Sequence, residues 1–275
     1  MLDPQPAAVG RVVTIRRHPV KSMLGEEIEA GELTPRGLLG DRAYALVDAE
    51  SGRVASAKDP RRWPNLFDFH AAFIGPAGDD RAPGPVRITL PDGGTLATDD
   101  GAEVDARLSE AVGRPVRLAR SALDGATSVG YVPDHDWLPG RDETFEFALP
   151  PGTFFDGAPV HLLTTATLDH LRKLTPGSLF EIPRFRPNLV IEAADGAGGF
   201  VEDGWIGRTL AIGAVRLRVE GPCPRCVMTT LAQGGLPKDP GILRTAVRDH
   251  GGNVGVYARV EQGGLVRRGD AVGLI

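Results

Sequence analysis

Glycine and proline recur along the whole chain, and their density is the feature that most limits how it folds. The 275 residues include 36 glycines and 23 prolines, which is well above the roughly 12% that the two contribute to an average protein. Both residues interrupt helices and strands and favour turns. We therefore expect many short strands joined by turns rather than a helical bundle. Hydrophobic residues make up 41% of the chain, which is enough for a packed core.

Local patterns agree with a mainly β chain that carries a few helices. Short apolar or alternating runs predict strands, and apolar residues at helical spacing predict helices. The expected strands are residues 10–15, 28–33, 43–48, 54–57, 86–90, 95–98, 160–163, 210–213, 215–219, 253–258 and 271–274, with helices at 104–113, 165–174 and 243–250. Segment 123–151 has no period, and we expect a linker or a rim loop there.

The predicted fold class is a β-barrel-rich α+β protein with two packed β-barrel-like units. The first unit is expected over residues 10–122 and the second over 123–275. The sequence does not fix this boundary sharply, and strands could be exchanged between the units.

Charge and hydropathy narrow the function classes. The chain has 31 Lys and Arg against 36 Asp and Glu, for a formal net charge of −5, so nothing indicates binding to nucleic acid or to a membrane surface. No apolar run reaches the length of a membrane span. Residues 1–6 lack the basic and apolar regions of a signal peptide, and we expect a cytoplasmic protein.

The sharpest motif is Gly221-Pro222-Cys223-Pro224-Arg225-Cys226, which holds both cysteines of the chain. A zinc site normally needs four ligands, and no second cysteine pair is present. A redox dithiol needs its first cysteine at a helix N-terminus, whereas residues 227–231 look strand-like. The sequence disfavours these two readings without excluding them. Two further readings are a single thiolate that binds a soft metal centre and two buried small residues at a turn.

Basic residues elsewhere favour the metal-centre reading. Lys21 and Ser22 follow the first strand, Arg42 follows Gly40-Asp41, and Arg186 lies in Pro183-Arg184-Phe185-Arg186-Pro187-Asn188. Brought together, they would supply the donors that an anionic phosphate or a pyranopterin-type ligand needs.

Five motifs occur in an order that resembles the MOSC (molybdenum cofactor sulfurase C-terminal domain) family with its N-terminal β-barrel domain. The resemblance covers the chain from about Arg11 to its end, and among relatives it points to the mitochondrial amidoxime-reducing component and its bacterial counterparts. The motifs are His18-Pro19-Val20-Lys21-Ser22, Gly37-Leu38-Leu39-Gly40-Asp41-Arg42, Phe185-Arg186-Pro187-Asn188, Glu202-Asp203-Gly204-Trp205-Ile206-Gly207 and Cys223-Pro224-Arg225-Cys226.

The resemblance implies a molybdenum cofactor (Mo-molybdopterin) and an oxidoreductase that reduces N-hydroxylated compounds, with oxygen transfer to molybdenum and without pyridoxal phosphate. It makes Cys226 the metal ligand and the catalytic residue. The residues that it implies as cofactor contacts are Lys21, Ser22, Arg42, Thr164, Arg186, Pro224, Arg225 and Cys226. Relatives carry serine at the position of Pro224, so a hydroxyl contact is missing there.

The same resemblance implies a separate electron donor, which would be a ferredoxin, a flavoprotein or a cytochrome. The alternative function is a protein that carries the cofactor or its sulfur without turning over a substrate, in which Cys223 could take part. We expect Trp205 and His161 to be packing residues, and Asp203 either to be structural or to orient an arginine of the pocket.

Overall fold

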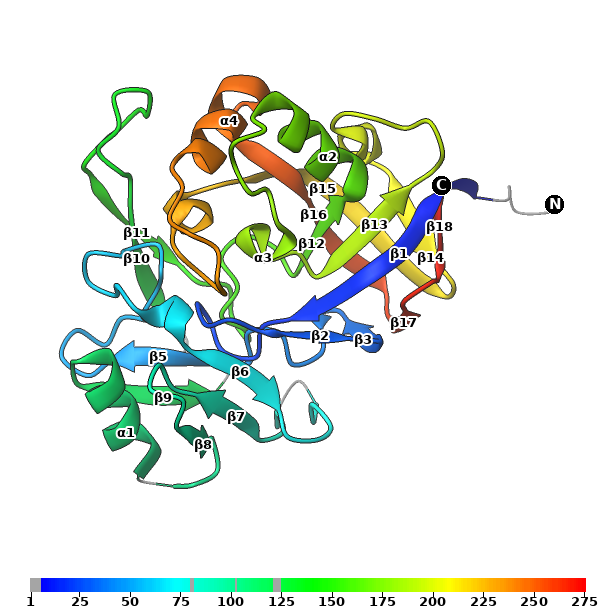
Figure 1. The fold of residues 1–275 in the computed structure, drawn as a ribbon. Helices are drawn as coiled ribbons and strands as arrows, with labels where there is room; N and C mark the ends of the chain where they lie inside the picture. Colours follow the sequence, from blue (N-terminus) through cyan, green and yellow to red (C-terminus); the bar gives the residue numbers. More distant parts are fainter. Residues whose placement is uncertain (1–5, 80–81, 102, 121–124) are drawn as a thin grey trace.

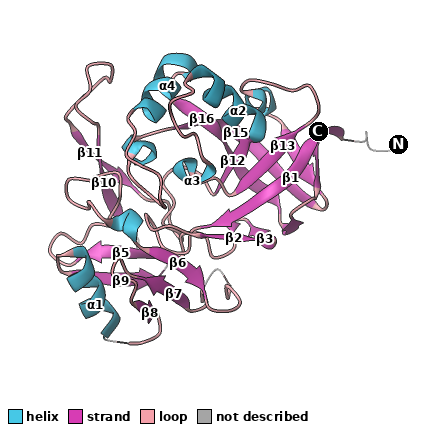
Figure 2. Ribbon diagram, in the orientation of Figure 1, coloured by secondary structure: helices cyan, strands magenta, loops and turns pink. Residues whose placement is uncertain are grey.

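The computed structural model describes residues 6–79, 82–101, 103–120 and 125–275. It is mostly strand, with four α-helices among the described residues (Figures 1 and 2). The strands are β1 (Ala7–Arg17), β2 (Glu26–Ile28), β3 (Ala30–Thr34), β4 (Gly37–Leu38), β5 (Tyr44–Asp48), β6 (His70–Phe73), β7 (Val86–Thr89), β8 (Thr95–Ala97), β9 (Val116–Arg120), β10 (Thr127–Tyr131), β11 (Thr144–Ala148), β12 (Val160–Thr164), β13 (Leu189–Ala193), β14 (Thr209–Ile212), β15 (Val215–Pro224), β16 (Asn253–Gln262), β17 (Gly264–Arg267) and β18 (Ala271–Leu274). The helices are α1 (Glu103–Val112), α2 (Thr165–Leu174), α3 (Ile182–Phe185) and α4 (Gly241–His250), with 3₁₀ helices η1 (Leu66–Asp68), η2 (Val201–Trp205) and η3 (Val227–Thr230).

A closed seven-stranded barrel forms the larger unit. Its strand order is β13-β12-β16-β15-β14-β18-β1, and pairing of β13 with β1 closes it. Alternating residues of β15 point inward, with Val215, Leu217 and Val219 fully buried, as the period of a strand requires. Helices α2 and α4 cover one side of this barrel (Figure 1).

The first strand of the chain belongs to this barrel. β1 pairs with β13 and β18, and β2 extends the sheet from the other end of β1. β3 likewise pairs with β17, close to the end of the chain. Residues at both ends of the sequence therefore build one barrel.

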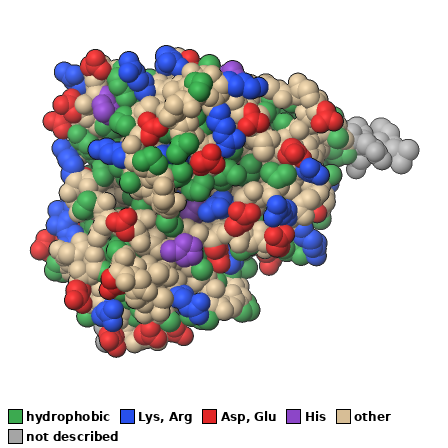
Figure 3. Space-filling model, in the orientation of Figure 1, with side chains coloured by type: hydrophobic (Ala, Val, Ile, Leu, Met, Phe, Trp, Pro, Cys, Tyr) green, Lys and Arg blue, Asp and Glu red, His purple; other side chains and the backbone are tan. Residues whose placement is uncertain are grey.

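The second unit packs short sheets and α1 around its own core. Its pairings are β5 with β9, β6 with β7, β7 with β8, and β10 with β11. Apolar side chains from β5, β7, α1 and η1 contribute to one cluster, which includes Tyr44, Leu46, Phe67, Ile88 and Leu108. On the face shown in Figure 3, side chains of both charges are intermingled over both units.

The structure confirms the predicted β-rich fold class, and three local predictions are wrong. Residues 54–57 make only isolated bridges through Val54. Part of 123–151 is the β10–β11 hairpin rather than a linker. Residues 227–230 form a 3₁₀ helix rather than a strand, because the Thr229 and Thr230 hydroxyls donate back to the carbonyls of Cys226 and Val227.

Two sequence predictions concern residues that lie outside the described ranges. One is the boundary between the two units, placed between residues 122 and 123. The other concerns residues 1–5, which belong to the segment predicted to lack the features of a signal peptide. Within the described residues, no helix combines the length and the apolar composition that a membrane crossing requires.

Candidate functional site

A cavity of about 330 Å³ brings together side chains from both units. Residues from the first 60 positions, from the segment around Asp156 and from the end of β15 all line it. The lining residues are Lys21, Ser22, Arg42, Lys58, Phe145, Phe155, Asp156, Gly157, Ala158, His161, Phe185, Arg186, Asn188, Pro224, Arg225, Cys226, Met228 and Tyr257. All the predicted site residues except Thr164 are in this set.

Four of the lining residues, Lys21, Arg42, Lys58 and Arg186, form what we call the cation cluster. Lys21 is 5% exposed, donates to the Phe154 carbonyl at 2.8 Å and is ion-paired with Asp156. Lys58 lies 3.0 Å from the other oxygen of Asp156. One partly buried carboxylate thus holds two ammonium groups at the cavity wall.

Burial and charge shape the protonation of this group. Burial lowers the pKa of Lys21 to about 8, although Asp156 opposes the shift. Burial also works against the charged form of Asp156, but the two lysines hold the pKa of Asp156 well below its usual range. Burial alone would lower the pKa of Lys58, yet Asp156 and Cys226 outweigh it and raise that pKa. At neutral pH, the cluster is therefore charged.

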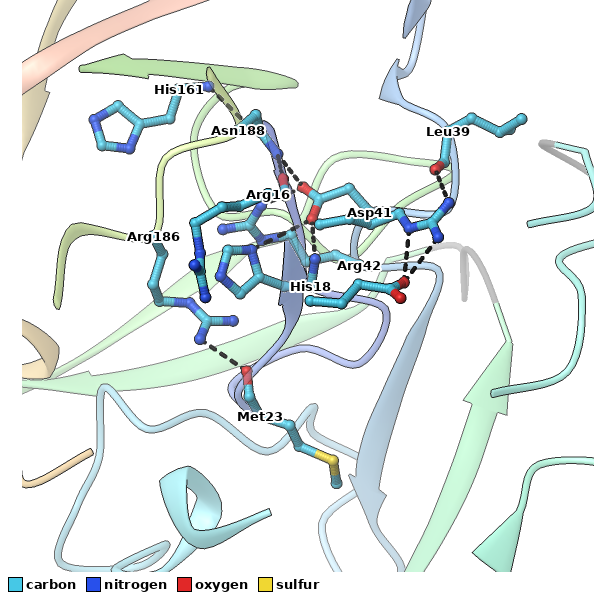
Figure 4. Close-up of polar contacts among 11 residues, drawn as sticks. Arg16, His18, Met23, Leu39, Asp41, Arg42, His161, Arg186 and Asn188 are labelled. Carbon is cyan, nitrogen blue, oxygen red and sulfur yellow. Dashed lines mark hydrogen bonds and ion pairs between the residues drawn. The ribbon is translucent and has the colours of Figure 1, made fainter. Parts of the chain in front are cut away.

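One arginine of the cluster, Arg42, is positioned by a buried polar network around Asp41 (Figure 4). Asp41 accepts from Arg42, from the His18 backbone N–H at 2.7 Å and from the Asn188 amide at 2.9 Å. These partners, Arg42 above all, outweigh the effect of burial and hold the pKa of Asp41 well below its usual range.

Arg186 is 6% exposed and donates to the Met23 carbonyl at 2.8 Å. Burial, and next the neighbouring Arg42, lower the pKa of Arg186 to about 9. No carboxylate forms an ion pair with Arg186 in the described part of the chain at 4.0 Å or less. A guanidinium in this setting has a free capacity for an anion.

Backbone strain is concentrated in this cavity. Among the described residues, four that are not glycine have positive φ, and three of these are Ser22 (64°), Arg42 (48°) and Arg186 (54°). A left-handed conformation costs a side-chain-bearing residue about 1–2 kcal/mol. Such conformations persist where the surrounding structure enforces them, and they gather at functional sites. The three residues are also among those predicted to hold the cofactor.

Cys226 lies directly before η3, at the end of what we call the thiol segment, Pro224, Arg225 and Cys226. Both cysteines are free; Cys223 is buried and Cys226 is partly exposed. Arg225 donates to the Cys223 sulfur at 2.7 Å and to the Phe185 carbonyl at 2.9 Å. Its Nε is buried without a partner. The cavity therefore has an accessible thiol beside a guanidinium that retains an unused donor.

Thr164 does not line the cavity. It is fully buried, and its hydroxyl caps α2 by accepting from the Thr167 N–H at 3.1 Å while it donates to Glu202 at 2.6 Å. The threonine precedes a helix, and capping occupies its side chain. The structure therefore does not bring the Thr164 hydroxyl to the cavity, and its role as a cofactor contact stays a prediction.

The other sequence motifs have structural roles. Trp205 packs in the barrel core, as expected. His161 is buried with its Nε2 3.2 Å from the Val254 carbonyl, also as expected. Within the described residues, the Asp203 carboxylate contacts no arginine of the cavity, and it lies 2.6 Å from Nε2 of His250. The second reading of Asp203, as an orienting group for an arginine, is wrong.

Sequence reasoning missed Lys58 and Asp156. Lys58 lies in a turn that looks like ordinary surface, and Asp156 lies in a loop without a motif. No local signal indicated either residue, because the two side chains meet only through tertiary packing.

The donor set of the cavity fits an anionic cofactor with a soft metal. Five of its lining residues are Lys or Arg, and Asp156 is the one acidic residue among them. A phosphate-bearing group would use the cationic excess, and a thiolate suits a soft metal. In the part of the chain that the structure describes, no three His, Cys, Asp or Glu side chains converge to hold a metal by themselves. A zinc site built from protein ligands alone has no support there.

Family models match nearly all of the chain. The MOSC N-terminal beta barrel domain matches residues 9–126, and the MOSC domain matches residues 150–273. The chain belongs to the MOSC family. The cavity is lined by residues from both matched regions.

Named relatives are similar to this MOSC protein over most of its length. Mitochondrial amidoxime reducing component 2 of Bos taurus is 28% identical over 81% of this chain and 67% of its own length. Molybdenum cofactor sulfurase of Anopheles gambiae is 26% identical over 90% of this chain, which spans only 34% of that protein. The solved structure of the YUAD protein from Bacillus subtilis aligns with 97% of this chain over 94% of its own chain. The sequence identity is 11% and the TM-score is 0.46.

Proposed function

We propose that this MOSC protein is a molybdenum cofactor-dependent oxidoreductase that reduces N-hydroxylated compounds such as amidoximes and hydroxylamines. The observation that carries the proposal is a single cavity in which five cationic side chains and one accessible thiol face one carboxylate. The similarity to amidoxime reducing component 2 supports the reaction class.

Different residues of the cavity would bind different parts of the cofactor. Cys226 would ligate the metal as a thiolate, and Lys58 is a neighbouring cation that interacts electrostatically with it. Lys21, Arg42 and Arg186 would bind the phosphate and the polar edge of the pterin. Arg225 would donate to the cofactor through groups that Cys223 and Phe185 leave free.

When bound, the cofactor supplies the two-electron chemistry that accepts an oxygen as an N–O bond breaks. The protein contributes a largely pre-formed cationic cavity, so little reorganisation is needed on binding. Two electrons must return from elsewhere, and we propose a separate donor protein, which would be a ferredoxin, a flavoprotein or a cytochrome. A cytoplasmic location stays a prediction.

The test is reduction of an amidoxime by cofactor-loaded protein with a reduced viologen as electron source. The proposed function predicts formation of the parent amidine by the wild-type chain and a loss of at least about a hundredfold in Cys226→Ser, because a second-row metal would lose its thiolate. No amidine from wild-type protein that contains both molybdenum and pterin would contradict it.

The alternative is a carrier of the cofactor or of its sulfur, and the similarity to molybdenum cofactor sulfurase favours it. A carrier would contain the cofactor, reduce no N-hydroxylated compound and pass sulfur to an acceptor. Cys223 argues against a sulfur relay through both thiols, because its side chain is fully buried and its sulfur accepts from Arg225.

A further inference from the structure

Phe145 on β11 is an exposed aromatic side chain at the edge of the cavity. It is 43% exposed, although large apolar side chains are usually buried. The same residue lines a second cavity of about 460 Å³, together with Val129 and Thr144 of the same hairpin. A ring that lines a cavity and is also exposed to solvent marks the opening of that cavity.

The Phe145 ring is held in place by Gly130. The two residues face each other across the β10–β11 pair. A Cβ at position 130 would lie 2.4 Å from Cζ of Phe145 and 2.8 Å from both Cε atoms. The ring therefore lies flat over the glycine, where any other residue would displace it. An aromatic ring over a cross-strand glycine is a recognised way to cover that position in a sheet.

A second ring and a lysine support Phe145 from the side. Phe147 lies on the same face of β11, with its ring centroid 5.9 Å from that of Phe145. Lys58 places its ammonium 4.5 Å from the centre of the Phe147 ring and also pairs with Asp156. Phe145 is thus connected through two contacts to the cation cluster, so its position depends on the same groups that line the cavity.

The size of the cavity determines where a substrate can lie. Ligand pockets usually have volumes of about 300–1,000 Å³, and this one, at about 330 Å³, is at the lower limit. A cofactor held by the cation cluster and Cys226 would take up most of it. A substrate must then meet the metal from the opening, where Phe145 presents its ring.

We propose that Phe145, held flat by Gly130, selects planar aromatic N-hydroxylated substrates by stacking against them at the opening of the cofactor cavity. This inference rests on the proposed function and adds a substrate preference to it. Stacked aromatic pairs gain stabilisation beyond their buried area, whereas a small aliphatic substrate has no ring to stack.

The test compares benzamidoxime with acetamidoxime, which share the reacting group and differ in the ring. The readout is the ratio of kcat/KM for the two substrates, with reduced viologen as donor. In Phe145→Ala, the ratio should fall about two- to tenfold, the range expected for loss of one stacked pair. In Phe145→Leu the ratio should fall similarly, because leucine keeps apolar area but has no ring. Phe145→Tyr should keep the wild-type ratio.

Gly130→Ala supplies a test that leaves Phe145 in the chain. Its methyl group should displace the ring and lower the ratio in the same direction. Leu265→Ala is the matched control, since Leu265 is 47% exposed on β17 and lines none of the cavities described above; its ratio should equal that of the wild type. Thermal unfolding and molybdenum content of each variant separate a misfolded chain from a change of preference.

Titration with benzamidine gives a readout that needs no turnover. Its dissociation constant should rise about two- to tenfold in Phe145→Ala and stay constant in Leu265→Ala. An unchanged substrate ratio together with an unchanged benzamidine affinity in Phe145→Ala would overturn the inference while leaving the proposed function intact. No reduction of either amidoxime by the loaded wild-type protein would overturn the proposed function, and this inference with it.

Discussion

The thiol segment consists of three consecutive residues at the end of one strand, whereas the cation cluster is assembled from segments that are far apart in the sequence. Lys21 follows β1, Arg42 precedes β5, Lys58 lies in a turn, and Arg186 ends α3. Two of these four residues, Arg42 and Arg186, have left-handed backbone. The comparison teaches that a local motif can place the metal ligand, while the anion-binding part of the cavity depends on tertiary packing and on strain that the packing must sustain.

Because the cation cluster depends on tertiary packing, we expect the largest loss of stability among the cavity variants when Asp41, which holds Arg42, is replaced. Asp41→Ala removes the acceptor of Arg42, of the His18 N–H and of the Asn188 amide. We expect the free energy of unfolding to fall by about 3–5 kcal/mol, because the partly buried guanidinium of Arg42 loses its ion-pair partner and two buried donors lose their acceptor. Chemical denaturation measures the change.

The matched control is Asp136→Ala, at an exposed position, with an expected effect within about 0.5 kcal/mol. A loss below about 1 kcal/mol in Asp41→Ala would show that the cation cluster does not depend on this network.

The second prediction concerns pH and Lys21. Its pKa in the folded protein is about 8, below the ordinary value of 10.5. The unfolded chain therefore binds more protons between pH 8 and pH 10.5, so the free energy of unfolding should rise with pH in that window, by at most about 1.4 kcal/mol per pH unit. Binding of inorganic phosphate to the cofactor-free protein should weaken over the same range, as the ammonium loses its charge.

Lys21→Met should remove the Lys21 contribution to both trends. Stability curves and phosphate titrations at pH 7, 8, 9 and 10 provide the comparison. Phosphate affinity that stays constant across this range in the wild type would mean that Lys21 does not contribute to anion binding.

The smallest effect is expected at Thr164, which lies outside the cavity. Thr164→Val should lower stability by about 1 kcal/mol, because α2 loses its capping side chain, and it should leave the molybdenum content of loaded protein unchanged. Thr164→Ser keeps the hydroxyl and should behave like the wild type. Loss of molybdenum from Thr164→Val without a change in thermal unfolding would instead indicate that Thr164 is a cofactor contact.

The sequence allowed the features set by local signals to be predicted, but not those that depend on tertiary packing. The helix at 165–174 and the hairpin at 86–98 were predictable because capping, periodicity and turn residues are local signals. The direction of the Thr164 hydroxyl, toward the α2 N–H groups and Glu202, could not be predicted, because it depends on packing with residues distant in the sequence. Lys58 and Asp156 could not be found, since nothing near either residue indicates that the two side chains meet in a cavity wall.

The central claim is that Cys226 and the cation cluster together hold a molybdenum cofactor. The most direct measurement is the molybdenum and pterin content of wild-type protein beside Cys226→Ala, both purified from cells able to make the cofactor. We predict close to one molybdenum and one pterin per wild-type chain. In the variant, the molybdenum content should be reduced or lost, while the cation cluster retains part of the pterin. Absence of pterin from both proteins, under conditions that load a known relative, would contradict the account.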